Sequence, residues 1–201
     1  MTPTPSRLQA MLVELESTLS RAGVRHAIAG GIAMAAHGRV RATEDIDVLV
    51  DAVQADALDV ALRSLGYAPR ASGIAMRYER SPLPGLPDMV EWIDVLLARR
   101  DAGRTLIARA QASPLRWQGI DLPVVDPAGL VLMKCLALAE NPSRPMDAAD
   151  AQYLLRTYAD SIDLAALERD AAALGADVAA ALAGLRSQGV AEAPHVGSGR
   201  L

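Results

Sequence analysis

Apolar residues recur along this chain with two spacings, which predict helices and strands. Where they return every three or four positions, one face of a helix would be apolar. That spacing, with the stop and start signals beside it, predicts helices over 6–22, 32–37, 52–65, 103–111, 126–139, 147–158, 164–174 and 177–187. Where polar and apolar residues alternate, or β-branched residues gather, a strand is favoured. Those patterns predict strands over 24–29, 45–50, 67–80 (one or two strands) and 89–97, with a hairpin over 115–125.

The order of these elements predicts an α/β (α+β) first part followed by a helical second part. We expect a mixed, strongly twisted sheet with helices on one side over 1–125, and a C-terminal helical bundle packed on it over 126–188. Asp126-Pro127 supplies the N-cap and first-turn proline that open the second part. A proline-rich loop is expected over 81–87, and a disordered tail of small residues over 189–201.

Composition and charge narrow the classes of protein. Hydrophobic residues make up 51% of the chain, but aromatics only 3%, so the core must be aliphatic. The net charge of -4 argues against capture of nucleic acid by bulk charge. The one cysteine excludes an intrachain disulfide, and no stretch reaches the roughly 20 apolar residues of a membrane span. Residues 1–7 carry no secretory signal, so we expect a cytoplasmic protein without a membrane anchor.

The strongest chemical signal is a pair of carboxylates in the strand over 45–50. Asp45 and Asp47 are two residues apart, so they project from the same face, while Ile46 and Val48 face a core. Like charges side by side repel each other, and a divalent cation between them relieves the repulsion. A solvated strand edge would show the same spacing, so the pair alone leaves both interpretations open.

A third carboxylate and a glycine pair add to this signal. Asp94 lies within an apolar strand, where an isolated carboxylate is costly, so it either completes a three-carboxylate cluster or pairs with an arginine. Gly30-Gly31 falls where a strand turns into a helix, a place where backbone N–H groups can face a phosphate. It is also compatible with an ordinary turn.

Together these residues resemble a known motif. Residues 29–33 (Ala-Gly-Gly-Ile-Ala) and 41–47 (Arg-Ala-Thr-Glu-Asp-Ile-Asp) are similar to the Gly-Gly/Ser and Arg-x-Thr-x-Asp-hydrophobic-Asp pattern of the DNA polymerase β-like nucleotidyltransferases. The branch that they most resemble is the AbiEii/AbiGii-type group of toxins. Lys134, followed by Arg144-x-x-Asp147-x-x-Asp150, matches a later element of that group in order and type. Gly31 departs from the pattern, since many catalytic members carry serine there.

The resemblance implies a role for each matching residue. Asp45, Asp47 and Asp94 would bind Mg²⁺ or Mn²⁺, and catalysis would depend on these acids together with Lys134 and Asp147. An NTP would be bound by Gly30, Gly31, Arg41, Thr43 and Lys134. Lys134 is the only lysine of the chain, and a compact ammonium binds phosphate differently from a guanidinium. Asp147 would position Lys134 or act near the acceptor, although it could equally cap a helix.

The implied reaction moves a nucleoside monophosphate from an NTP to a hydroxyl acceptor with metal assistance. The acceptor is left open: a tRNA end or other RNA, a protein hydroxyl or a small molecule. Arginines that could bind RNA phosphates gather at Arg99, Arg100, Arg104, Arg109 and Arg116, although a solvated charged face would look the same. A cognate antitoxin protein is a further expected partner. The alternative function is a non-catalytic module of the same fold that binds a nucleotide or a protein.

Overall fold

The computed structural model describes residues 6–71, 76–81 and 90–191. The chain divides into two compact units, residues 1–126 and residues 127–201.

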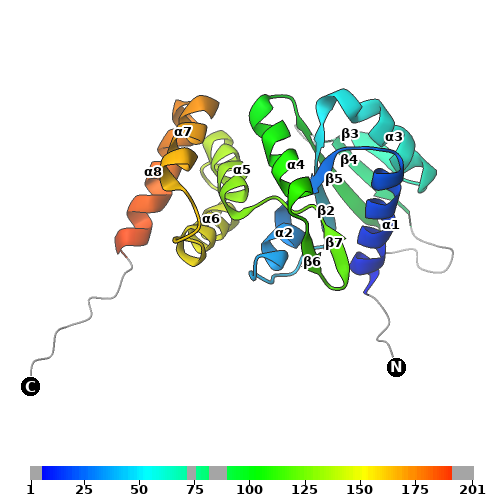
Figure 1. Cartoon of the computed structure of the whole chain (residues 1–201), viewed down its shortest axis with the longest axis horizontal. Helices are drawn as coiled ribbons and strands as arrows, with labels where there is room; N and C mark the ends of the chain where they lie inside the picture. The colour runs from blue at the N-terminus through cyan, green and yellow to red at the C-terminus, as the bar shows by residue number, and fades with distance from the viewer. Residues whose placement is uncertain (1–5, 72–75, 82–89, 192–201) are drawn as a thin grey trace, which may run out of the picture. The chain divides into compact units, whose positions relative to one another are not determined.

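The first unit contains a five-stranded sheet in the order β1-β2-β5-β4-β3. Figure 1 labels β2, β5, β4 and β3 of this sheet. Its strands are β1 (His26–Ile28), β2 (Asp45–Asp51), β3 (Ala68–Ala71), β4 (Met76–Arg80) and β5 (Glu91–Ala98). β2 and β5 run parallel, and the other three neighbouring pairs are antiparallel. The sheet is therefore mixed, as the sequence predicts.

Alternation along β2 gives the sheet two chemically different faces. Ile46, Val48 and Val50 are fully buried on one face. The other face carries Asp45 and Asp47, and we call it the acid face. Register with β2 assigns each residue of β5 to one face, because paired residues in neighbouring strands point the same way.

Two helices, α1 (Arg7–Arg21) and α3 (Ala55–Ser64), cover the apolar face. The hydroxyl of Tyr78, a residue of that face, donates to Asp59 of α3 at 2.9 Å. Nε2 of His26 lies 2.7 Å from Oε2 of Glu16 in α1. A 3-10 turn, η1 (Ala52–Gln54), joins β2 to α3.

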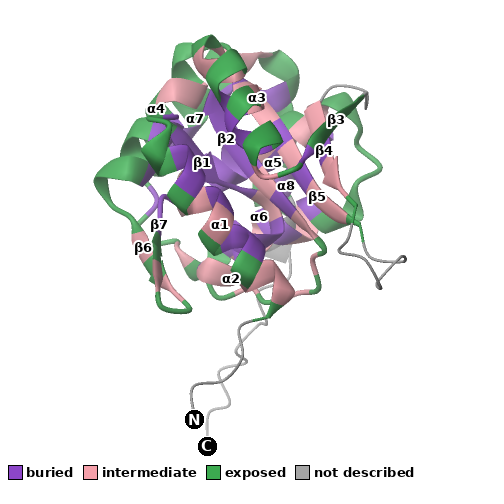
Figure 2. Ribbon diagram, turned by 90° about the vertical axis from the view of Figure 1, so that its right-hand side faces the viewer, coloured by how far each residue is buried: buried purple, intermediate pink, exposed green. Residues whose placement is uncertain are grey.

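A further helix, α4 (Asp101–Ala112), packs against the acid face at the end of β2 and β5. A Cβ on Gly103 would lie only 2.8 Å from Cβ of Ala98, so the helix and strand are in close contact. Helices therefore lie on both faces, and the expectation of helices on one side is wrong. The alternation holds only in the first half of β2, because Leu49 and Asp51 are buried as well. In Figure 2, β2 is coloured largely as buried.

Helix α2 (Gly30–Ala36) and a small hairpin complete the first unit. The hairpin joins β6 (Leu115–Trp117) to β7 (Ile120–Leu122) through Gln118 and Gly119, whose φ angles of 48° and 84° fit a two-residue turn. After the hairpin, the amide of Val125 donates to the carbonyl of Ile28 at 2.9 Å, which ties this segment to β1.

The second unit is helical, as the sequence predicts. Its helices are α5 (Pro127–Glu140), α6 (Pro145–Thr157), α7 (Leu164–Leu174) and α8 (Ala176–Ala191). Leu130, Val131, Cys135, Leu154 and Ala171 form its core. Helix α8 includes residues 189–191, which were expected to begin a disordered tail; residues 192–201 of that tail lie outside the described residues.

Residues 82–87 of the expected proline-rich loop lie outside the described residues. Within the described part of the chain, no helix combines the length and the apolar character that crossing a bilayer requires.

Candidate active site

Three carboxylates lie on the acid face at neighbouring positions. In the parallel pairing of β2 with β5, Asp47 is directly opposite Asp94, and Asp45 is opposite Trp92. Asp94 therefore points to the same side of the sheet as Asp45 and Asp47. The side chains of Asp45 and Asp94 are 35% and 17% exposed, so both carboxylates are partly desolvated while remaining accessible.

An arginine that the sequence analysis did not single out binds the third carboxylate. Arg77 of β4 is directly opposite Asp94 in the antiparallel pairing with β5. Its Nε and Nη2 atoms donate to Oδ1 and Oδ2 of Asp94, each at 2.5 Å. Nη2 also lies 3.9 Å from Oδ2 of Asp45, and the guanidinium carbon lies 5.2 Å from the ring centroid of Trp92. The hydrogen bond to Asp94 and the charges of the three acids raise the pKa of Arg77, although partial burial opposes this shift.

The donor atoms fit a hard divalent cation in kind. Carboxylate oxygens are the ligands that Mg²⁺ and Mn²⁺ prefer. Within the described ranges, no three His, Cys, Asp or Glu side chains are grouped closely enough, as they stand, to hold a metal ion. Both oxygens of Asp94 are directed to Arg77 in this arrangement.

The glycine pair packs directly against two residues of the motif. Gly30 has a φ of +55°, and a Cβ built on it would lie 1.7 Å from Oδ2 of Asp47. A Cβ on Gly31 would lie 2.7 Å from Oγ1 of Thr43. A side chain at either position would displace Asp47 or Thr43, and at Gly30 it would also strain the left-handed backbone. The space beside Asp47 is kept open by the absence of a side chain.

Thr43 and Arg41 belong to the segment that leads into β2. The hydroxyl of Thr43 donates to Oδ1 of Asp45 at 2.9 Å, which fixes the direction of that carboxylate. Arg41 is half-buried. The contact of Thr43 shows how the Thr-x-Asp spacing can act: the hydroxyl orients the carboxylate two residues later.

The later motif forms a charged cluster within the second unit. Nζ of Lys134 lies 2.6 Å from Oδ1 of Asp147 and 3.1 Å from Oδ2 of Asp150. Arg144 makes an ion pair with the same Asp147. Lys134 is only 9% exposed, and Asp150 is fully buried. The charges of Lys134 and Arg144 therefore balance those of Asp147 and Asp150 in this cluster.

His37, which ends helix α2, makes a structural contact. Its Nε2 lies 2.9 Å from the carbonyl oxygen of Val125, and the ring is buried. It joins α2 to the segment that precedes α5.

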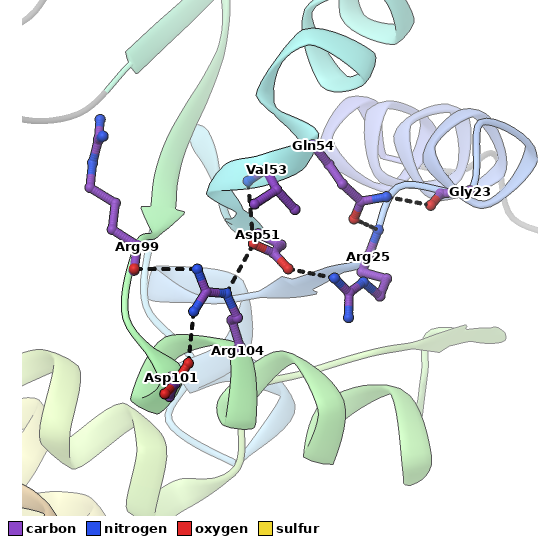
Figure 3. Close-up of polar contacts among 8 residues, drawn as sticks. All are labelled: Gly23, Arg25, Asp51, Val53, Gln54, Arg99, Asp101 and Arg104. Atoms are coloured by element: carbon purple, nitrogen blue, oxygen red, sulfur yellow. Dashed lines mark hydrogen bonds and ion pairs between the residues drawn. The ribbon is translucent and has the colours of Figure 1, made fainter.

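Sequence reasoning also missed a polar cluster around Asp51 at the other end of β2 (Figure 3). Asp51 is 2% exposed and accepts hydrogen bonds from Arg25 at 2.5 Å and from Arg104 at 3.3 Å. Burial opposes its ionisation, but the Val53 amide and the two arginines outweigh it and lower the pKa of Asp51. The cluster fastens α4 to β2, so Arg104 has a structural role.

Other arginines of the same stretch also pair with acids. Arg109 binds Asp126, and Arg116 binds Asp121 across the β6–β7 hairpin. Arg99 and Arg100 are exposed at the end of β5.

Comparison with known proteins places the chain in a family. The profile of a family described as uncharacterised nucleotidyltransferases matches residues 5–188. The chain belongs to this nucleotidyltransferase family. No curated protein matches it significantly. The comparisons give no support to the AbiEii/AbiGii-type branch.

Solved structures show the same fold. The solution structure of the antibiotic-resistance factor ANT(2″)-Ia is 16% identical, with a TM-score of 0.51, covering 90% of this chain and 92% of its own. The crystal structure of ANT(2″)-Ia with adenylyl-2″-tobramycin is 18% identical, with a TM-score of 0.53, covering 89% and 97%. An antigenic nucleotidyltransferase-like protein from Paracoccidioides brasiliensis is 16% identical, with a TM-score of 0.55, covering 91% and 89%.

Proposed function

We propose that this nucleotidyltransferase-family protein transfers a nucleoside monophosphate from an NTP to a hydroxyl acceptor at the acid face. The observation that carries the proposal is the register of β2 with β5, which sets Asp47 opposite Asp94 with Asp45 on the same side. Three carboxylates at adjacent positions would repel one another without a cation. Arg77 balances one of these three charges, and a bound divalent cation would balance the other two.

Each residue has a task in this proposal. Asp45 and Asp47 would hold Mg²⁺ or Mn²⁺ and, through it, the triphosphate; Asp94 would serve the acceptor side. Bound divalent ions would stabilise charge on the phosphoryl oxygens and favour ionisation of the acceptor hydroxyl. Thr43 keeps Asp45 oriented, and Gly30 leaves room beside Asp47.

The covalent change is a simple displacement. The acceptor oxygen bonds to the α-phosphorus, the bond between the α-phosphorus and the bridging oxygen breaks, and pyrophosphate leaves with the electron pair. The acceptor proton is released on the side of Asp94. Lys134, with Asp147 beside it, is proposed to contact phosphate, together with Gly30, Gly31 and Arg41, as the motif implies.

The class of acceptor is a finer proposal. The crystal structure of ANT(2″)-Ia holds adenylyl-2″-tobramycin, an adenylylated small molecule, which makes a small hydroxylated acceptor one candidate. An RNA acceptor, such as a tRNA end, is supported by the arginines after β5. Three of those five arginines, Arg104, Arg109 and Arg116, pair with acids, so the support rests on Arg99 and Arg100. A cognate antitoxin rests on the motif resemblance alone.

The test combines labelled nucleotides with fractionated acceptors. The protein is incubated with each α-³²P-labelled NTP, Mg²⁺, and either the RNA, protein or small-molecule fraction of a lysate. We expect label to enter one fraction, and Asp47→Asn and Asp94→Asn to abolish it. Asp56→Asn, an exposed acid of α3, is the matched control and should label like wild type.

The alternative, a non-catalytic binding module, gives a different result in the same experiment. Calorimetry would detect NTP binding in the presence of Mg²⁺, while no label would be transferred to any fraction. Transfer that survives both Asp47→Asn and Asp94→Asn would refute the proposed site.

A further inference from the structure

Arg77 is a resident cation within the acid face. It belongs to β4, and its guanidinium binds both oxygens of Asp94 while it approaches Asp45 to 3.9 Å. Side-on contacts of this kind between arginine and a carboxylate are short, directional and about twice as strong as neutral hydrogen bonds. The Asp94 side of the pair is only 17% exposed, so it is better shielded from solvent than an ordinary surface carboxylate.

The neighbouring strand offers an internal comparison. Arg70 of β3 is the register partner of Arg77, so both arginines project from the acid face. Arg70 is 64% exposed and pairs with Glu79 at 2.5 Å. The two arginines therefore take different acids, and only Arg77 is bonded to a member of the carboxylate cluster.

The charge count shows what Arg77 does for the cluster. Asp45, Asp47 and Asp94 carry three negative charges, and Arg77 neutralises one of them. The remaining two match one divalent cation. The bonds to Arg77 also hold the carboxylate of Asp94 towards β4, and the described residues include no three-acid group ready to hold a metal ion.

We propose that Arg77 competes with the divalent cation for Asp94 and so sets the metal affinity of the site. Metal would complete the cluster only when Asp94 gives up at least one of its two bonds to Arg77 and turns towards Asp47. Arg77 thereby keeps the three acids compatible with folding in the absence of metal, at the cost of weaker metal binding. The inference rests on the proposed function, since it concerns the same carboxylates.

Direct metal binding without nucleotide tests the competition. Mn²⁺ binding to the full chain is followed by electron paramagnetic resonance for wild type, Arg77→Gln and Arg70→Gln. We expect Arg77→Gln to bind Mn²⁺ at least about tenfold more tightly. A hydrogen bond to a charged group typically contributes more free energy than the amount that changes an affinity about tenfold. Arg70→Gln should bind like wild type.

Trp92 provides a second readout that does not depend on activity. The guanidinium lies over its ring, so movement of Arg77 should change the emission of Trp92. With Trp117→Phe as background, Mg²⁺ should produce a saturable change in emission. The same titration of Arg77→Gln should produce little change, although the variant binds metal more tightly.

The outcomes separate this inference from the proposed function. Mn²⁺ binding that is equal or weaker in Arg77→Gln, with wild type binding metal, overturns the competition and leaves the metal site intact. If neither protein binds Mn²⁺, and Asp47→Asn is indistinguishable from both, the metal site fails and the competition fails with it. Circular dichroism verifies that Arg77→Gln is folded. Arg77→Lys keeps the charge but cannot make the bidentate contact, so it should bind Mn²⁺ with intermediate affinity.

Discussion

Gly30 packs so closely against Asp47 that a side chain at position 30 would overlap it: a Cβ on Gly30 would lie 1.7 Å from Oδ2 of Asp47. Replacement of Gly30 by alanine must therefore displace a carboxylate of the proposed metal site. We expect Gly30→Ala to reduce nucleotidyl transfer at least about 100-fold, because small displacements at a reacting centre are that costly. Initial rates with the labelled acceptor measure this effect.

Gly23 is the matched control for backbone strain. Its φ of +63° is close to the +55° of Gly30, but no atom lies within 4 Å of an added Cβ. Both alanine variants should lose about 1–2 kcal/mol of stability from the left-handed conformation. Only Gly30→Ala should lose activity, and equal loss in both variants would show that strain, rather than displacement of Asp47, is responsible.

Lys134 yields a prediction with two separable readouts. Its ammonium lies between Asp147 and Asp150 and is buried. Lys134→Ala should lower the free energy of unfolding by about 3 kcal/mol, because it leaves buried carboxylates without their partner. If the ammonium also contacts phosphate, NTP affinity should fall about tenfold, measured by calorimetry below the melting temperature.

Asp150→Asn distinguishes these two effects. It removes one internal partner but keeps the ammonium, so phosphate binding should be maintained or tightened while stability falls. A parallel loss of NTP affinity in Lys134→Ala and Asp150→Asn would assign Lys134 a structural role only.

The buried thiol of Cys135 should resist ionisation and labelling while the second unit is folded. Burial raises the pKa of its thiol to about 11 from an ordinary value of 9.0. At pH 8 only about one thiol in a thousand would be ionised, against about one in ten for an unshifted thiol, so Ellman's reagent should react only after unfolding. Because the raised pKa means that the folded protein favours the neutral thiol, the thiol's contribution to stability is intact below pH 9.0. That contribution is lost between about pH 9 and 11. Rapid labelling of the folded protein at pH 8 would contradict this.

The local part of the site followed from short-range pattern. Asp45 and Asp47 share a face because residues two apart in any strand do so. The pairing of Thr43 with Asp45 is equally local, since a hydroxyl two residues before a carboxylate can reach it. These features needed no knowledge of the tertiary structure.

The rest depended on strand register, which periodicity cannot supply. Asp94 faces Asp47 because β5 pairs in parallel with β2, although α3, β3 and β4 separate the two strands along the chain; a slip of one residue would turn Asp94 to the other face. Arg77 was missed for the same reason: its partner is set by the antiparallel register of β4 with β5. Residues two apart in any strand, such as Arg77 and Glu79, share a face, but this alternation does not determine which acid lies beside Arg77.

The last prediction concerns Arg99 and Arg100, which carry the support for an RNA acceptor. Arg104 holds the buried Asp51, so a substitution there would disturb the attachment of α4 as well as any RNA contact. Arg99→Glu with Arg100→Glu changes exposed side chains instead, and should leave the melting temperature within about 2 °C of wild type. If RNA is the acceptor, labelling of RNA by the double variant should fall at least about tenfold while NTP affinity stays the same. Wild-type labelling should weaken steeply as salt rises, because counterions return to each phosphate that is released.

Arg116→Glu, in the β6–β7 hairpin, is the control for a general change of charge. Equal labelling of RNA by wild type and double variant across the salt titration would exclude these arginines from acceptor binding and favour a small hydroxylated molecule.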